Sequence, residues 1–136
     1  MDIKKLSIKA KEFGIWVNIF NKRLFLTIAN SISYDENILF ITKAHHIKTS
    51  HKYPVVITDK GVYVSKYRSL YGGLQSWAFS IDKITNIFHY KGIFFDTIVV
   101  SIEGDAVVIA KQSKKKANKI MEIFNGLRIV NKSEDN

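Results

Sequence analysis

Residues 76–81 read SWAFSI, in which Trp77, Phe79 and Ile81 alternate with small residues. A period of two places alternate side chains on opposite faces of a β-strand, so this stretch predicts a half-buried strand. Further runs of apolar, β-type character predict the other strands, at residues 38–42, 53–58, 62–64, 84–90, 97–102 and 106–110. The sequence therefore indicates about seven strands between residues 38 and 110.

The connections between these strands are short. Residues 59–61 (DKG) and 103–105 (EGD) are typical of tight turns, and we expect Gly61 to supply a positive φ. Parallel neighbours need long crossovers, so short connections favour an antiparallel meander. A sheet of this size has to close or cover its edges, which favours a barrel.

Helices are expected on both sides of the strands. Residues 2–13 and 113–127 carry apolar side chains at helical spacing, and Ser113 is a suitable N-cap for the second of these segments. Gly126 lies where a C-terminal cap is expected. Residues 15–32 are interpreted as a further helix. The last helix would close one open end of the barrel.

The 136 residues are expected to form one domain with no disulfide or thiolate site, because the chain has no cysteine. We expect no enzyme, no cofactor and no metal, because no phosphate-binding loop, dinucleotide motif or nucleophile elbow occurs. His45, His46 and His51 are weak metal candidates, since adjacent histidines on a loop lack a rigid frame. No leader and no apolar run of membrane-spanning length occurs, which predicts a cytoplasmic protein.

Two segments resemble a known family. Residues 55–64, VVITDKGVYV, resemble the hairpin of bacterial pleckstrin-homology-like (PH-like) domains of the YokE-like group, although Gly61 stands where that family commonly has Arg. Residues 79–87, FSIDKITNI, resemble the family's apolar-Pro-Leu-x-x-Ile-x-x-Val signature, without a Pro before Asp82. The similar region spans roughly residues 37–127.

The resemblance implies an α+β, mainly β fold: a PH-like, seven-stranded antiparallel barrel, partly open and capped by the C-terminal helix. It divides the chain into an N-terminal helical extension (1–33), the barrel with its capping helix (34–128) and a flexible tail (129–136). The fold implies binding and does not name the ligand.

The formal net charge of +9 favours anionic partners, although a solvated basic surface or an AT-rich genome explains it equally well. The positive charge is densest in residues 43–52 and at the start of the last helix. The candidate anion- or partner-binding residues are Lys43, His45, His46, Lys48, His51, Lys52, Lys111, Lys114, Lys115, Lys116 and Lys119.

We interpret the chain as a non-enzymatic binding or adaptor module whose partner is an unidentified protein, bound through a strand edge and the loops. The alternative is an anionic partner, nucleic acid or acidic membrane lipid, bound by residues 43–52 and 113–127. Self-association is a third hypothesis. The aromatic side chains are expected in the core, with one of Phe94 and Phe95 exposed.

Overall fold

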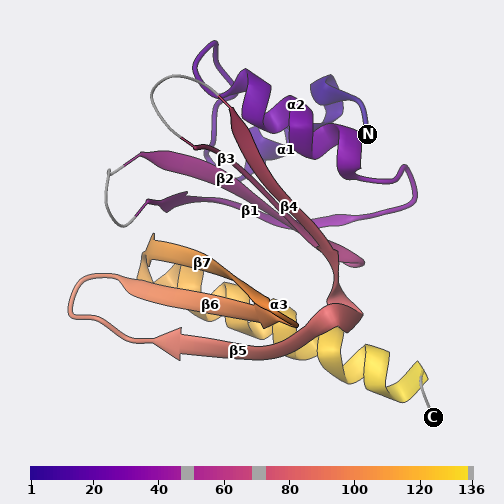
Figure 1. Cartoon of the computed structure of the whole chain (residues 1–136), viewed down its shortest axis with the longest axis vertical. Helices are drawn as coiled ribbons and strands as arrows, with labels where there is room; N and C mark the ends of the chain where they lie inside the picture. The colour runs from indigo at the N-terminus through magenta and orange to yellow at the C-terminus, as the bar shows by residue number, and fades with distance from the viewer. Residues whose placement is uncertain (47–50, 69–72, 135–136) are drawn as a thin grey trace.

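Two antiparallel sheets, one of four strands and one of three, face each other in the computed structural model (Figure 1). The structure describes residues 1–46, 51–68 and 73–134. In chain order the elements are α1 (Ile3–Glu12), α2 (Lys22–Ser31), β1 (Ile38–His45), β2 (Lys52–Thr58), β3 (Gly61–Tyr67), β4 (Leu74–Ser80), the 3₁₀ helix η1 (Ile81–Lys83), β5 (Ile84–Tyr90), β6 (Asp96–Ile102), β7 (Asp105–Gln112) and α3 (Lys114–Glu134).

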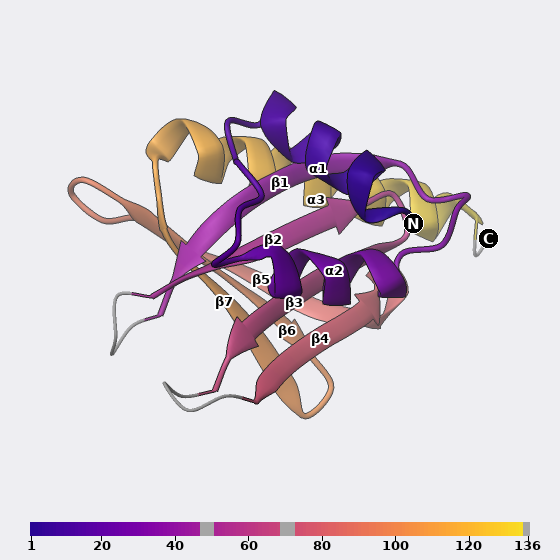
Figure 2. The ribbon, with the colours of Figure 1, turned by 90° about the horizontal axis from the view of Figure 1, so that it is seen from above.

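The expected antiparallel meander of seven strands is confirmed, but the expected barrel is not closed. The strands pair in the orders β1-β2-β3-β4 and β5-β6-β7. The η1 turn redirects the chain between β4 and β5, so the two strands do not continue one ladder. The sheets consequently cross as separate layers (Figure 2), and no backbone ladder joins β1 to β7 among the described residues.

The buried side chain of Gln112 joins β1 to β7 where a backbone ladder is missing. Its Oε1 accepts a hydrogen bond from Thr42 Oγ1 at 2.7 Å, and its Nε2 donates to Lys43 O at 2.8 Å. Nε2 also donates to Ala110 O at 3.1 Å. We call this group the Gln112 clasp. Tyr53 adds a second link between the sheets, since its hydroxyl donates to Val108 O at 2.6 Å.

Strands β1 to β3 of the four-stranded sheet are buried on both faces, whereas β4 is partly exposed. Val55 and Ile57 of β2 point into the core between the sheets, where Ala117, Ile120 and Phe124 of α3 also pack. Val56 points the other way, into a second core beneath α1 and α2. Side chains of β2 therefore show no polar alternation, as is usual for a strand covered on both sides.

Helices α1 and α2 lie across the outer face of the four-stranded sheet (Figure 2). Leu6 of α1 and Phe25 of α2 are fully buried there. The second helix begins at Lys22, later than the sequence predicted. Asn18 Oδ1 accepts hydrogen bonds from the backbone N–H groups of Phe20 and Asn21, which stabilises a turn in place of a first helical turn.

Two expectations for glycines are wrong. Gly61 has no positive φ and starts β3; a Cβ there would lie 3.0 Å from Phe79 O, so close approach of β4 explains the glycine. Gly126 does not end α3, which continues to Glu134. The backbone of Gly126 does not adopt the left-handed conformation of a C-terminal cap. The division into 1–33, 34–128 and 129–136 stays a prediction.

Replacing Gln112 with leucine tests the clasp. Gln112→Leu keeps the side-chain size but leaves the Thr42 hydroxyl and the Lys43 carbonyl without their partner. We expect the free energy of unfolding to fall by about 2–3 kcal/mol in urea titrations. Gln75→Leu, at a half-buried position of β4, is the matched control and should change it by less than about 0.5 kcal/mol. Equal effects of the two changes would contradict the role of the clasp.

Candidate functional site

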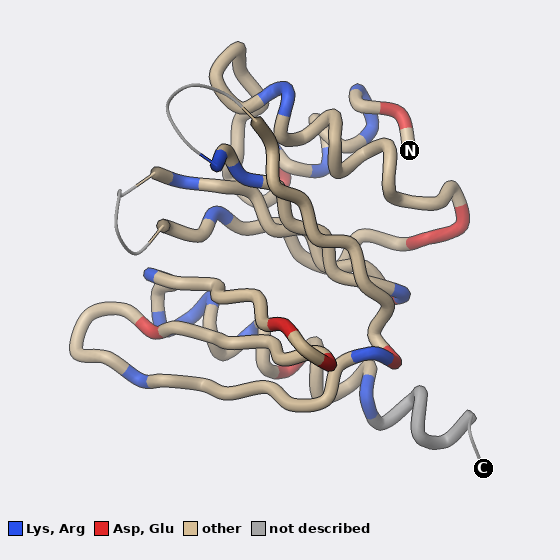
Figure 3. Tube along the Cα trace, in the orientation of Figure 1, with Lys and Arg blue, Asp and Glu red and all other residues tan. Residues whose placement is uncertain are grey.

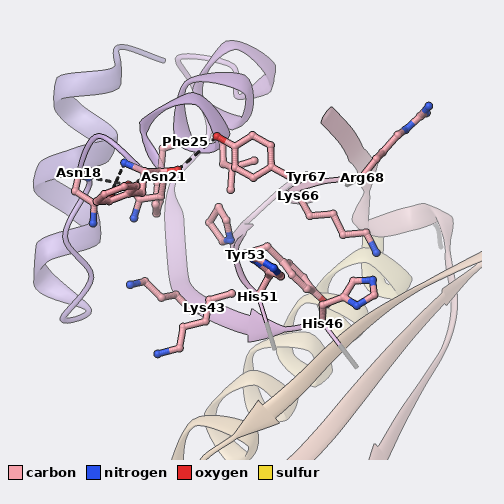
Figure 4. Close-up of a pocket in the computed structure, with 14 residues that line it drawn as sticks. Asn18, Asn21, Phe25, Lys43, His46, His51, Tyr53, Lys66, Tyr67 and Arg68 are labelled. Atoms are coloured by element: carbon pink, nitrogen blue, oxygen red, sulfur yellow. Dashed lines mark hydrogen bonds between the residues drawn. The ribbon is translucent and has the colours of Figure 1, made fainter. Parts of the chain in front are cut away.

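A pocket of about 570 Å³ opens where the start of α2 faces the ends of β1, β2 and β3. Leu24 and Phe25 of α2 form one apolar wall, and Tyr53 and Pro54 of β2 form the other. Figure 4 shows Tyr67 and Phe25 on the helix side of this space and Tyr53 across from them. We call it the main pocket.

Every charged side chain that lines the main pocket is basic or a histidine. These residues are Lys43, His46, His51, Lys52, Lys66 and Arg68. None of the four Lys and Arg side chains forms an ion pair with a described acidic residue. Their charges are therefore not neutralised within the described part of the chain, and the pocket has a positive potential.

Aromatic rings hold one of these cations in position. Lys66 Nζ lies 5.0 Å from the ring centroid of Trp77 and 5.7 Å from that of Tyr53. Both distances are within the range of a cation–π interaction. Burial raises the pKa of Tyr53 to about 12, so its hydroxyl stays neutral at pH 7 and Lys66 does not face a phenolate.

The loop of residues 14–21 forms the rim of the main pocket. Asn21 Oδ1 accepts from the Asn18 N–H at 2.7 Å, and Asn21 Nδ2 donates to Trp16 O at 3.0 Å. The Tyr67 hydroxyl donates to Phe20 O at 3.4 Å and so ties this loop to β3. Side-chain hydrogen bonds thus give the rim a defined shape.

The β1–β2 hairpin lies between the main pocket and a smaller hollow of about 260 Å³. Lys43 and Lys52 of this hairpin line both spaces. We call it the junction hollow, and its other lining residues are Gly14, Ile15, His45, Phe95, Lys111, Gln112, Ser113 and Lys116. It therefore lies directly beside the Gln112 clasp.

Four lysines and one histidine, His45, line the junction hollow, and His45 differs from the lysines in its charge. Burial, helped by the charges of Lys52 and Lys111, lowers the pKa of its imidazole, so the ring is neutral at pH 7. Its buried Nδ1 has no hydrogen-bond partner among the described residues. An anion in the hollow would favour the protonated ring.

The structure separates the predicted basic residues into groups. Lys43 and Lys52 line both spaces; His46 and His51 line the main pocket; His45, Lys111 and Lys116 line the junction hollow. Lys114 Nζ pairs with Asp96 at 2.8 Å, Lys119 with Glu122 at 3.7 Å, and Lys115 lines neither space. Lys48 lies outside the described residues.

The family model described as "Bacterial PH domain" matches residues 32–125. The chain belongs to the bacterial PH domain family. The fold is also similar to the crystal structure of a DUF1696 family protein with a pleckstrin-homology domain from Shewanella loihica PV-4. That likeness has a TM-score of 0.58 and 14% sequence identity, and covers 82% of this chain and 93% of the other. A comparison with curated proteins found no match.

In this bacterial PH domain, part of the main pocket lies outside the family match. Asn18, Phe20 and Phe25 precede residue 32, where the match begins. The pocket therefore combines family strands with a helical segment that the family model does not include. No helix among the described residues is long and apolar enough to cross a membrane.

Sequence reasoning missed Lys66 and Arg68. The β2–β3 pairing places Val64 opposite Val55, so the end of β3 lies beside the start of β2. Continued along the strands, that register brings Tyr67, with Lys66 and Arg68 on either side of it, to the start of β2. The predicted hairpin already contained this signal, because the two strands must run antiparallel from the turn at residues 59–60.

Asp96 is the acidic residue that organises the connection between β5 and β6. Its carboxylate accepts hydrogen bonds from Lys114 Nζ at 2.8 Å and Gly92 N at 3.1 Å, and lies 2.7 Å from His89 Nε2. The bonds from Lys114 and His89 lower the pKa of Asp96 to about 2. This network fixes residues 91–95 beside the junction hollow.

The lowered pKa of Asp96 predicts an acid-dependent loss of stability. The ionised carboxylate stabilises the fold above its ordinary pKa of 3.8, and this contribution disappears as the pH falls towards about 2. We expect Asp96→Asn to be less stable than the wild type at pH 7 and to lose less stability between pH 4 and pH 2. Urea titrations at each pH measure this. Gln75→Leu, which removes no ionisable group, is the control and should retain the wild-type slope. An unchanged slope in Asp96→Asn would count against this network.

Proposed function

We propose that the protein is a non-enzymatic binding module whose main pocket binds a ligand with an anionic group and an apolar part. One observation carries this proposal: the main pocket is lined by Lys43, Lys52, Lys66 and Arg68 and by no described acidic residue. These cations stand around an apolar floor. Such a pocket repels cations and favours binding of a ligand in which an anionic group and an apolar surface lie close together.

The ligand's anionic group fits between the β1–β2 hairpin and the end of β3. Lys43 approaches this space from one side and Lys66 approaches it from the other (Figure 4), and Lys52 also lines the pocket. Hydrogen bonds from ammonium groups to phosphate or carboxylate oxygens are stronger than neutral ones. The apolar part of the ligand would contact Phe25, Tyr53 and Pro54.

Membership of the bacterial PH domain family supports a binding role. We infer that the protein belongs near the YokE-like group, because residues 55–64 and 79–87 resemble the hairpin and the signature of that group. We also propose that it acts in the cytoplasm. Nucleic acid fits the pocket less well than a compact anion does. Successive bases bind to a row of aromatic platforms along an open groove, whereas this site is one pocket.

The proposal can be tested by titrating the protein with phenyl phosphate while the amide chemical shifts are monitored in NMR spectra. The compound joins a dianion to an aromatic ring, so we expect shifts around β1–β3 and the start of α2 and weaker binding as the salt concentration rises. Lys52→Gln and Lys66→Gln should each weaken binding about threefold to tenfold. Lys83→Gln, in η1 at the far end of the β4 strand, removes the same charge and should leave binding unchanged.

Two comparison compounds complete this experiment. Phenol lacks the charge and inorganic phosphate lacks the ring, so both should bind more weakly than phenyl phosphate. Shifts spread over the whole surface, or equal losses in Lys83→Gln and Lys52→Gln, would show nonspecific attraction to the net charge and overturn the proposal.

A protein partner is the second candidate, because the outer edges of β4 and β5 have no strand partner among the described residues. Among the described strands, β4 pairs only with β3 and β5 pairs only with β6. An extended peptide can add to such an edge through backbone hydrogen bonds. Salt separates the two candidates, since binding at a strand edge should hardly change with salt whereas binding in the basic pocket should weaken.

A further inference from the structure

Large apolar side chains project into the solvent from the rim of the main pocket. Trp16, Ile19 and Phe20 have exposed fractions of 63%, 86% and 79%. All three belong to one short stretch, residues 16–20, which we call the rim tip. Exposed apolar groups of this size generally mark an interaction site, and tryptophan is one of the residues that contribute most to binding at protein interfaces.

Hydrogen bonds hold the rim tip in one conformation. Asn18 Oδ1 accepts from the N–H groups of Phe20 and Asn21, at 2.9 and 3.1 Å. The Asn18 carbonyl accepts from Lys22 N at 2.8 Å. Asn21 Nδ2 donates to Trp16 O at 3.0 Å, so the two ends of the stretch are joined. A partner that binds here does not have to order the loop, which lowers the entropic cost of association.

The rim tip is continuous with the main pocket through Phe20, whose side chain also lines the pocket. Phe20 O accepts from the hydroxyl of Tyr67, a second exposed ring in the pocket lining. Trp16 and Ile19 lie outside the lining. A compact ligand in the pocket would therefore leave these two side chains in water, whereas a longer ligand can cover both.

Cations without acidic partners accompany the rim tip. Lys22 and Arg23 follow it as the first residues of α2, and Lys11 Nζ lies 4.7 Å from the ring centroid of Trp16. None of these three side chains forms an ion pair with a described acidic residue. In Figure 3 the start of α2 is blue, and the chain is red between the end of α2 and β1. The charge beside the rim tip is therefore positive.

The acidic residues of the N-terminal helices are already engaged. Before residue 32 the chain has two, Asp2 and Glu12. Asp2 Oδ1 accepts from Lys4 N at the start of α1, and Glu12 pairs with Lys9 at 3.1 Å. A partner that carries negative charge would therefore supply the counter-charge that the rim tip lacks.

We propose that the partner of the main pocket and the rim tip is a segment of another protein that carries acidic and apolar side chains close together. Its apolar side chains cover Trp16 and Ile19, and its carboxylates pair with Lys22, Arg23 and the cations of the pocket. Such a segment is long enough to occupy the pocket and the rim tip at once. This inference rests on the proposed function, because the segment supplies the anionic and apolar groups that the pocket binds, and it names the class of partner.

A bilayer fits the rim tip less well than a protein segment does. Lys11 lies over the Trp16 ring, so burial of that ring among acyl chains would draw an ammonium group out of water. A protein segment can cover the ring and offer a carboxylate to Lys11 at the same time. The rim tip also precedes residue 32, where the family match begins, so this contact belongs to the chain's own N-terminal segment.

Selection of a random library of short synthetic peptides on the full chain tests this inference. We expect enrichment of peptides in which Asp or Glu lies close to Leu, Ile or Phe. Trp16→Ser and Ile19→Ser should each weaken binding of a selected peptide about tenfold in fluorescence anisotropy titrations. Both variants should bind phenyl phosphate like the wild type, because neither residue lines the main pocket.

Ile93→Ser is the matched control. Ile93 is 87% exposed, as Ile19 is 86% exposed, but it lies between β5 and β6 of the other sheet. Its replacement should leave peptide binding unchanged. Equal losses in Ile19→Ser and Ile93→Ser, or no enrichment of acidic peptides, would overturn the inference.

The phenyl phosphate titration separates failure of this inference from failure of the proposed function. If the wild type binds phenyl phosphate and no acidic peptide is selected, the proposed function stands and the protein partner does not. If it binds neither, both are overturned. Binding to phosphatidylglycerol vesicles that is lost in Ile19→Ser, without any selected peptide, would assign the rim tip to a bilayer and overturn the protein partner.

Discussion

The amide of Gln112 connects two sheets that share no backbone ladder. It accepts from Thr42 and donates to the Lys43 carbonyl, so it fixes the end of β7 against the end of β1. The consequence reaches the surface, because Lys43 lines both basic spaces and Lys111 immediately precedes Gln112. A buried polar group with all its partners in place specifies a geometry that apolar packing alone leaves less defined.

The N-terminal helices complete the site as well as the core. Sheet β1–β4 has two apolar faces, and α1 and α2 bury the outer one through Leu6, Phe25 and Ile28. The same packing brings Phe25 to the wall of the main pocket and the loop before α2 to its rim. Stability and binding therefore depend on one segment, and a change in the α2 packing should affect both.

The strands were predictable because alternation and turn residues are local signals. The open sandwich was not, since it depends on the turn at residues 81–83 and on a contact between Thr42 and Gln112. For the site, the run of basic residues from Lys43 to Lys52 was visible in the sequence. Lys66 and Arg68 were missed because pairing between β2 and β3 brings them there. The prediction placed Phe88 and one ring of the Phe94–Phe95 pair in the core, and all three rings are exposed, since hydrophobicity alone does not distinguish a core ring from one at the surface.

The placement of the clasp also has a kinetic consequence. Each hairpin of the meander joins residues close in sequence, whereas the Thr42–Gln112 bond joins residues 70 apart. Hairpins close quickly, and long-range contacts form once much of the chain is ordered. The clasp should therefore be absent from the folding transition state, so it acts mainly by slowing unfolding. The open seam between β1 and β7 is then the place where the native sandwich first comes apart.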